Sequence, residues 1–340
     1  MKLEQQFSDI IHLIKSARFN ALKAVNTELI SLYWEIGKYI TLRTQNEGWG
    51  KSTVSQLANY IQSQQPEIKG FSDKNLWRMK QFYEVYCHFP ILSALLRELS
   101  WTNNLLIISK CNSIEEREFY LNLSVKEKYT SRELERQINS SLFERMLISN
   151  TAFSTLAPVL PANFENVFKE TYVLDFLNLP EPYTENDLQK ELVKQMKHFI
   201  TELGKDFLFV GEEYRVQVGT KDYRLDLLFY HRELQCLVAI ELKITDFEPE
   251  HLSKLNFYLE ALDRDVKKTH ENPSIGILLC KGKDEEVVEY ALSRNISPTL
   301  ISQYTLALPN KVVLQNKLHE IYELFENRKI NEEELKRDKE

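Results

Sequence analysis

The stretch Tyr223-Arg-Leu-Asp-Leu-Leu-Phe-Tyr-His-Arg-Glu-Leu-Gln-Cys-Leu-Val-Ala-Ile-Glu-Leu-Lys243 decides the fold, because it holds two apolar, strand-like runs. The runs cover residues 223–231 and 234–243, and only Arg232 and Glu233 separate them. Two such runs with a two-residue break indicate a β-hairpin.

The hairpin places three ionisable side chains on one face. If Arg232 and Glu233 form the loop, Asp226 faces Ala239 across the two strands. Side chains alternate with period two, so Glu241 and Lys243 share the face of Asp226. Any even-length loop about the same centre gives the same result.

Three ionisable groups on an otherwise apolar hairpin are costly to bury unless they are paired or bind a metal. Two converging carboxylates form the oxygen-rich site that Mg²⁺ prefers, and a lysine beside them can stabilise the charge that develops during phosphate hydrolysis. The alternative is a structural ion pair, in which Lys243 neutralises Asp226 or Glu241 at the mouth of a sheet. The spacing alone is compatible with both interpretations.

Longer stretches of the sequence resemble the YhcG-like family of the PD-(D/E)XK nuclease superfamily. The resemblance extends over most of the chain and is strongest in residues 207–261, 275–280 and 288–292, and in Val25–Gly37, Trp49–Gly50, Gly70–Ser72 and Ser131–Ile138. It implies a restriction-endonuclease-like α/β sandwich in the C-terminal half, after an all-α N-terminal domain.

The resemblance also implies roles for the three hairpin residues. Asp226 and Glu241 would hold a divalent metal, Mg²⁺ or Mn²⁺, together with the backbone carbonyl of Leu242. Lys243 would assist hydrolysis of a phosphodiester bond. The catalytic set expected from the resemblance is therefore Asp226, Glu241 and Lys243.

Further polar residues of the site are expected on the helices before and after the hairpin. An acidic residue on the preceding helix is common in the superfamily, and Glu202 and Glu191 are both candidates. Lys254 and Asn256 lie on the following helix, where the superfamily often places another polar residue. The chain departs from its relatives at Asn103 and Asn104, where histidines are usual, so a role that needs a histidine there is in doubt.

Length and composition predict two domains in a cytoplasmic protein. A chain of 340 residues exceeds the usual single-domain size. No apolar run approaches the roughly 18 residues that span a bilayer, and the first residues lack the apolar core of a signal peptide. The four cysteines have no metal-binding spacing, so we expect reduced, packed thiols. We place a helical domain at 1–150, a junction at 148–164, a nuclease-like domain at 165–325 and a charged tail at 326–340.

The net charge of −7 is unusual for a protein that binds nucleic acid. The charge is unevenly distributed, since residues 1–150 contain 19 Lys and Arg against 16 Asp and Glu, and the remainder contains 24 against 34. The mildly basic first half is therefore the better candidate for phosphate contacts.

Within the first half, residues 53–64, a Pro-Glu-Ile-Lys-Gly turn and residues 73–86 have the proportions of a helix-turn-helix, with Ser72 as the N-cap of the second helix. Lys74, Arg78 and Lys80 could face phosphates there. A solvated face in an ordinary helical bundle is the alternative. The four tryptophans, which all lie in this half, are expected to anchor the core.

The second half alternates helix and strand. We expect helices there at 186–203 and 249–266, and strands at 207–210, 214–218, 223–231, 234–243 and 275–280; a further helix is expected at 131–145, at the end of the first half. This order agrees with an α/β sandwich.

The sequence thus predicts a metal-dependent nuclease, acting on DNA, with a helical module that recognises the substrate or a partner. No membrane partner is expected, and homo-oligomerisation is left open. The alternative is a regulator that binds nucleic acid or protein on a nuclease fold without catalysis.

Overall fold

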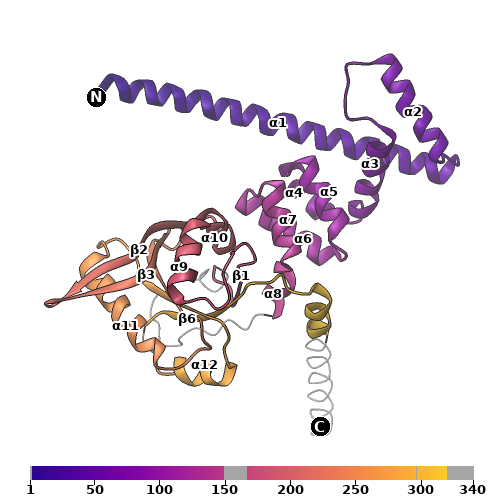
Figure 1. Ribbon diagram of the computed structural model, residues 1–340. Coiled ribbons are helices and arrows are strands. Elements are labelled where there is room, and N and C mark those ends of the chain that lie inside the picture. Colours follow the sequence, from indigo (N-terminus) through magenta and orange to yellow (C-terminus); the bar gives the residue numbers. More distant parts are fainter. Residues whose placement is uncertain (1, 149–166, 296, 320–340) are drawn as a thin grey trace, which may run out of the picture. The chain divides into compact units, whose positions relative to one another are not determined.

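The computed structural model describes residues 2–148, 167–295 and 297–319, and the chain divides into two compact units, Met1–Ile138 and Asn139–Glu340 (Figure 1). Apart from residue 148, the predicted junction lies outside the described residues, and so does the predicted charged tail. Residues 139–148, which the sequence places in the helical domain, cluster with unit 2. The predicted domain boundaries stay a proposal.

The regular elements in the described residues of unit 1 are helices, as the sequence predicts. Its elements are α1 Lys2–Asn46, α2 Lys51–Gln64, α3 Asp73–Tyr86, the 3₁₀ turn Pro90–Leu92, α4 Ser93–Glu98, α5 Trp101–Lys110, α6 Ile114–Glu127 and α7 Ser131–Asn139. Ser72, Ser100 and Ser113 each cap a helix, because each hydroxyl accepts a hydrogen bond from the backbone N–H three residues later. The sequence therefore fixes where α3, α5 and α6 begin.

Helices α1 and α3 pack closely around aromatic side chains. Trp34 packs edge-on against Phe82, with ring centroids 5.7 Å apart, and Trp101 packs in the same way against Phe82 at 5.3 Å. A Cβ atom on Gly37 would lie 2.1 Å from the Met79 carbonyl oxygen, so only glycine allows this approach. Trp34 and Trp101 are half-buried and pack on the fully buried Phe82, while the expectation that all four tryptophans anchor the core stays a prediction.

Unit 2 contains a mixed sheet of six strands in the order β1-β6-β5-β4-β3-β2. Its elements are α8 Leu142–Ile148, β1 Thr171–Val173, α9 Glu185–Lys194, α10 Met196–Leu203, β2 Phe207–Val218, β3 Lys221–His231, β4 Cys236–Leu242, α11 His251–Ala261 followed by a π-helical turn Leu262–Val266, β5 Ile275–Cys280, α12 Glu285–Leu292 and β6 Thr299–Thr305. Strands β2, β3 and β4 are antiparallel, and β4, β5, β6 and β1 run parallel.

Helices cover both faces of this sheet. Leu192 of α9 and Phe199 of α10 share one core cluster with Ile240 of β4. Leu255 of α11 belongs to the other cluster, together with Ala239 of β4. Strand β4 is buried on both faces, which explains its continuous apolar sequence. The predicted α/β sandwich is confirmed.

Four predicted elements differ from the structure: two predicted helices are each interrupted, and two predicted strands are continuous. The predicted helix 131–145 divides into α7 and α8 at Ser141, whose φ of 53° lies in the left-handed region. The predicted helix 186–203 divides into α9 and α10 at Gln195. The predicted strands 207–210 and 214–218 form one strand, β2, with a register shift between Phe209 and Gly211.

The hairpin register differs from the predicted one by two residues. Leu227 pairs with Ile240 and His231 pairs with Cys236, so the loop has four residues, 232–235. Continued by one residue, this register sets Asp226 level with Glu241 rather than with Ala239. A shift of two residues leaves each side chain on its predicted face, because side chains alternate with period two.

The described residues contain no helix that is both long and apolar enough to cross a membrane. All four cysteines are free thiols, and Cys111, Cys236 and Cys280 are buried. This agrees with the expected reduced, packed cysteines.

Candidate active site

Asp226 lies where β3 separates from β4, and two hydrogen bonds fix its position. Its Oδ2 accepts a hydrogen bond of 2.8 Å from the backbone N–H of Leu242 on β4. Its backbone carbonyl accepts one of 2.8 Å from Nε2 of Gln189 on α9. The strand end and α9 together hold this carboxylate beside the end of β4.

Glu241 is completely buried at the end of β4, with 0% of its surface exposed. Its Oε1 accepts a hydrogen bond from Lys254 Nζ of α11 and lies 3.7 Å from Lys243 Nζ. Its Oε2 has no hydrogen-bond partner among the described residues. A buried carboxylate oxygen without a partner is costly, so it marks a position where a further group could bind.

The two lysines differ in their surroundings. Lys243 Nζ donates to Glu185 Oε2 of α9 at 3.0 Å and to the Leu242 carbonyl at 2.9 Å, and its side chain is 13% exposed. The Lys254 side chain is 48% exposed. Lys243 is therefore held inside the site, whereas Lys254 reaches it from the solvent side.

Burial raises the pKa of Glu241 to about 7, and the neighbouring charge of Asp226 acts in the same direction. Burial also raises the pKa of Asp226, although the hydrogen bond from Leu242 opposes the change. Burial acts to lower the pKa of Lys254, but the hydrogen bond with Glu241 together with the charges of Glu241 and Asp226 outweighs this, so the pKa is raised. The carboxylates of Asp226 and Glu241 therefore repel each other when both are charged, and a bound cation would reduce this repulsion.

The site's donors are those that Mg²⁺ or Mn²⁺ takes. Two carboxylates and the Leu242 carbonyl converge there, and one carboxylate oxygen has no partner. No group of three or more His, Cys, Asp or Glu side chains is placed to hold a metal within the part of the chain that the structure describes. A metal here would be held by Asp226, Glu241 and a backbone carbonyl, which fits a hard cation that keeps several waters.

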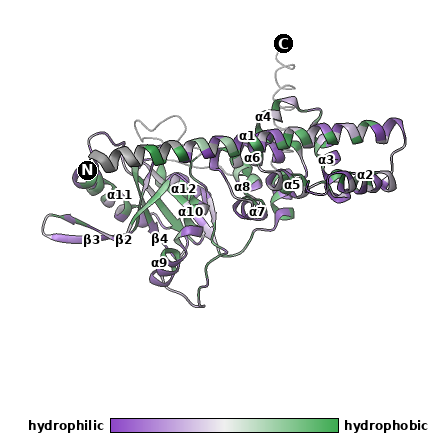
Figure 2. Cartoon of the chain, turned by 90° about the horizontal axis from the view of Figure 1, so that it is seen from above, coloured by the Kyte–Doolittle hydropathy of each residue, from purple (hydrophilic) through white to green (hydrophobic). Residues whose placement is uncertain are grey.

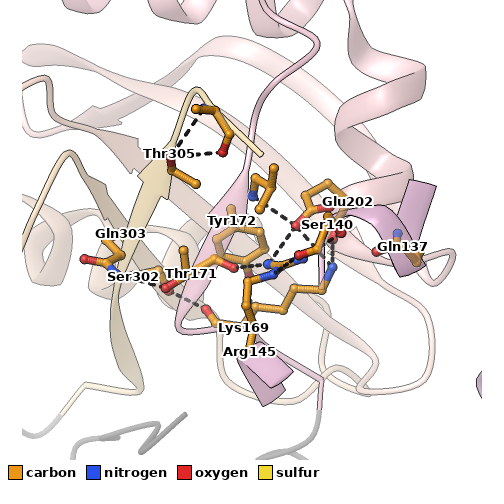
Figure 3. Close-up of polar contacts among 12 residues, drawn as sticks. Gln137, Ser140, Arg145, Lys169, Thr171, Tyr172, Glu202, Ser302, Gln303 and Thr305 are labelled. Carbon is orange, nitrogen blue, oxygen red and sulfur yellow. Dashed lines mark hydrogen bonds and ion pairs between the residues drawn. The ribbon is translucent and has the colours of Figure 1, made fainter. Parts of the chain in front are cut away.

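Glu202 does not join this site. It is buried in a separate cluster, where its Oε1 accepts hydrogen bonds from Arg145 at 3.3 Å and from the Val173 N–H at 3.1 Å, with Lys169 3.4 Å away (Figure 3). Arg145 also donates to the Thr171 carbonyl at 2.6 Å. This arrangement connects α8, β1 and α10, and it indicates a structural role.

Glu191 pairs instead with Lys194 on its own helix, at 3.0 Å. The acidic residue of the preceding helix that reaches the site is Glu185, through Lys243. Sequence reasoning missed Glu185 and Gln189. The signal was their spacing, since polar residues at positions i and i+4 beside the apolar Leu188 and Leu192 lie on neighbouring turns of one helix.

Of the two predicted polar residues on the helix after the hairpin, only Lys254 reaches the site. Asn256 Nδ2 donates to Asn295 at 2.8 Å, and its Oδ1 accepts from Thr299 at 3.3 Å. Residues two apart on a helix point in nearly opposite directions, so Lys254 and Asn256 could not both face Glu241.

The three residues of α3 that the sequence predicts as nucleic-acid contacts differ in exposure. Lys74 and Arg78 are exposed. Lys80 is largely buried, forms a 2.5 Å ion pair with Glu84 and lies over the Trp77 ring. Lys74 and Arg78 are therefore freer to meet a phosphate than Lys80.

Asn103 and Asn104 are buried and hydrogen-bonded to backbone carbonyls. Asn103 donates to Tyr129 at 3.0 Å, and Asn104 donates to Leu96 at 3.0 Å. Both asparagines thus connect segments of the helical unit, which explains their burial without a catalytic role.

Comparison with known proteins gives matches over both halves of the chain. The YhcG PDDEXK nuclease domain matches residues 165–319, and the DUF1016 N-terminal domain matches residues 9–145. The protein named "Putative nuclease YhcG" from Escherichia coli (strain K12) is 30% identical over 352 aligned residues, which cover 92% of this chain and 93% of that protein.

Two solved structures are similar only in part. The crystal structure of a repair endonuclease from Pyrococcus abyssi has 17% identity and a TM-score of 0.25, covering 38% of this chain and 50% of that chain. An EndoMS–dsDNA2 complex has 18% identity and a TM-score of 0.23, covering 35% and 45%. This chain thus spans about half of each, and the scores are too low to support conclusions about it.

Proposed function

This chain belongs to the YhcG family, with a PDDEXK nuclease domain, and from that membership we propose that it is a metal-dependent nuclease that hydrolyses phosphodiester bonds in DNA. One observation supports the site most strongly. Glu241 is buried beside Asp226, its pKa is raised to about 7, and its Oε2 has no partner among the described residues. A divalent cation would satisfy that oxygen and relieve the repulsion between the carboxylates.

Asp226, Glu241 and the Leu242 carbonyl would hold Mg²⁺ or Mn²⁺. When bound, the metal would polarise the phosphate and acidify the attacking water. With Glu185, the three carboxylates outnumber the two lysines of the site, which favours a cation. Lys243 donates to the Leu242 carbonyl in this structure, so its ammonium would have to release this oxygen for the carbonyl to help hold the metal.

Lys243 has a separate role in this proposal. Its ammonium lies 3.7 Å from Glu241 Oε1, close to where the phosphate would meet the carboxylates. There it would stabilise the negative charge that grows in the transition state. Glu185 accepts a hydrogen bond from the same Nζ, so we assign Glu185 as the positioning residue for Lys243.

The helical unit would supply part of the affinity for nucleic acid. Lys74 and Arg78 on the exposed side of α3 are the proposed phosphate contacts, and α2 and α3 have helix-turn-helix proportions. In the full chain, Lys74→Gln with Arg78→Gln should lower the salt dependence of binding, with a slope change of about 1 per lost contact. We also propose a cytoplasmic location, which fits the free cysteines.

A direct test incubates the purified full chain with Mg²⁺, with Mn²⁺ or with EDTA on single-stranded and double-stranded DNA and RNA. Cleavage of DNA that needs the metal and is lost in Asp226→Asn supports the proposal. Cleavage of RNA alone corrects the substrate. Binding of nucleic acid without cleavage under any of these conditions supports the alternative, a catalytically silent regulator.

A further inference from the structure

Strands β2 and β3 continue beyond the sheet as a two-stranded ribbon. Strand β3 pairs with β4 only from Leu227 to His231, whereas the pairing of β2 with β3 extends to Val218 and Lys221. Figures 1 and 2 both show this hairpin projecting from the rest of unit 2. Asp226 lies at its base, so the ribbon starts at the candidate active site.

One face of the ribbon is buried against α11. Val216 and Leu225 belong to the core cluster that contains Leu255 and Leu259. The Tyr223 ring packs at 4.6 Å from the Phe257 ring. Because strand side chains alternate, the residues between these point to the opposite, solvent-exposed face.

That exposed face carries two arginines directly opposite each other. Arg215 pairs with Arg224 in the β2–β3 register, and their side chains are 62% and 68% exposed. Arg215 forms an ion pair of 2.7 Å with Asp222, and Arg224 forms one of 2.5 Å with Glu213. Each guanidinium is therefore neutralised by an acidic residue of the ribbon itself.

Two arginines opposite each other on a ribbon do little to stabilise the folded protein, which suggests that they serve another purpose. Like charges in directly opposed cross-strand positions are destabilising, and the compensating exposed ion pairs contribute little, about 0–1 kcal/mol each. A phosphate can therefore replace either carboxylate at low cost, and guanidinium binds phosphate with two parallel hydrogen bonds.

The position relative to Asp226 suggests what the pair binds. Arg224 precedes Asp226 by two residues, which corresponds to about 7 Å along a strand. A distance of this size is comparable with the separation of neighbouring phosphates along one DNA strand, so Arg224 would meet a phosphate close to the one at the carboxylates.

We propose that Arg215 and Arg224 form a phosphate-binding pair that holds the substrate strand next to the scissile phosphate. This inference rests on the proposed nuclease function. It assigns to the ribbon the backbone of a nucleic acid, because the pair presents two positive charges directly opposite each other.

The test measures the affinity of the full chain for a DNA duplex in EDTA, where metal-dependent cleavage is absent, over a range of salt concentrations. The double variant Arg215→Gln/Arg224→Gln should lower the salt slope by about 2 and weaken binding at least tenfold at low salt. Arg264→Gln is the matched control, since Arg264 is also exposed and paired with an acidic residue, Glu260. The control should change neither quantity.

A second variant guards against misfolding. Glu213→Gln/Asp222→Asn removes the competing carboxylates and keeps the arginines, so it should bind the duplex more tightly. Equal salt slopes in the arginine variant and the control would overturn the inference even if the wild type cleaves DNA. Absence of cleavage with retained arginine-dependent binding would instead overturn the nuclease function and leave the phosphate contact standing.

Discussion

Glu241 and Glu202, two of the buried glutamates of unit 2, are both candidates for the site from the sequence and differ in the structure. Glu241 and Glu202 are both 0% exposed, and each has two cationic side chains within 4 Å. Arg145 and Lys169, the partners of Glu202, are themselves largely buried. Lys254, one partner of Glu241, is half exposed, and one oxygen of Glu241 has no partner among the described residues.

The difference separates a structural ion cluster from a site that can take a ligand. The Glu202 cluster connects three elements through hydrogen bonds to side chains and backbone, so its charges stabilise the fold. The Glu241 site has a second carboxylate, Asp226, and a raised pKa, so its charges oppose one another until a cation enters. Burial of a glutamate is therefore a poor guide to function. Whether each of its carboxylate oxygens has a hydrogen-bond partner is a better guide.

The largest expected effect is on cleavage. Glu241→Gln should abolish hydrolysis, a loss of at least a thousandfold, because the amide cannot provide the charge that holds the metal. The melting temperature should stay the same or rise, since repulsion with Asp226 is removed. A variant that cleaves at the wild-type rate would show that the site is assigned wrongly.

Glu202→Gln should give the opposite result. Removing this charge leaves Arg145 and Lys169 buried without their carboxylate, which should lower the free energy of unfolding by about 3–5 kcal/mol. Chemical denaturation measures this loss, with Glu260→Gln as a surface control expected to change little, since Glu260 is exposed and ion-paired with Arg264. Cleavage per folded molecule should be normal, and a specific catalytic defect would move Glu202 into the active site.

Lys243→Ala separates charge stabilisation in the transition state from structural pairing. We expect hydrolysis to slow by roughly a hundredfold while metal affinity stays nearly the same. Lys194→Ala, which removes an exposed lysine of α9, is the control and should cleave normally. If Lys243→Ala melts early but cleaves at a normal rate per folded molecule, Lys243 is only an ion-pair partner.

A smaller effect is expected on the pH dependence of stability without metal. The pKa of Glu241 is about 7 in the folded protein against an ordinary value of 4.5, so between these pH values the folded state binds more protons than the unfolded state. Stability should therefore fall as the pH rises from about 4.5 to about 7, by a total of about 3 kcal/mol. Glu241→Gln should flatten this slope, and parallel curves for the two proteins would contradict the raised pKa.

The hairpin residues could be predicted from the sequence because their placement depends only on the period of two. The register was wrong by two residues, and Asp226, Glu241 and Lys243 still met. The helix residues could not be placed in this way. The break at Gln195 gives α10 its own direction, so Glu202 cannot be related to α9 by counting helical turns.

The sequence also could not predict which side chains contact each other across the site. Glu185 and Gln189 follow a capping box at Thr184 and look like ordinary first-turn residues of a helix. Only the packing of α9 beside the end of β4 brings them to Lys243 and Asp226. The left-handed residue Ser141, which ends α7, likewise has no marker such as glycine in the sequence.

The most direct test of the two-glutamate comparison is a calorimetric titration of Mn²⁺ into the wild type, Glu241→Gln and Glu202→Gln, at a pH above 7 and a temperature at which all three are folded. We predict that the wild type and Glu202→Gln bind the ion with the same affinity and that Glu241→Gln loses this binding. Binding by Glu241→Gln with the wild-type affinity would contradict the assignment of Glu241 as a metal ligand.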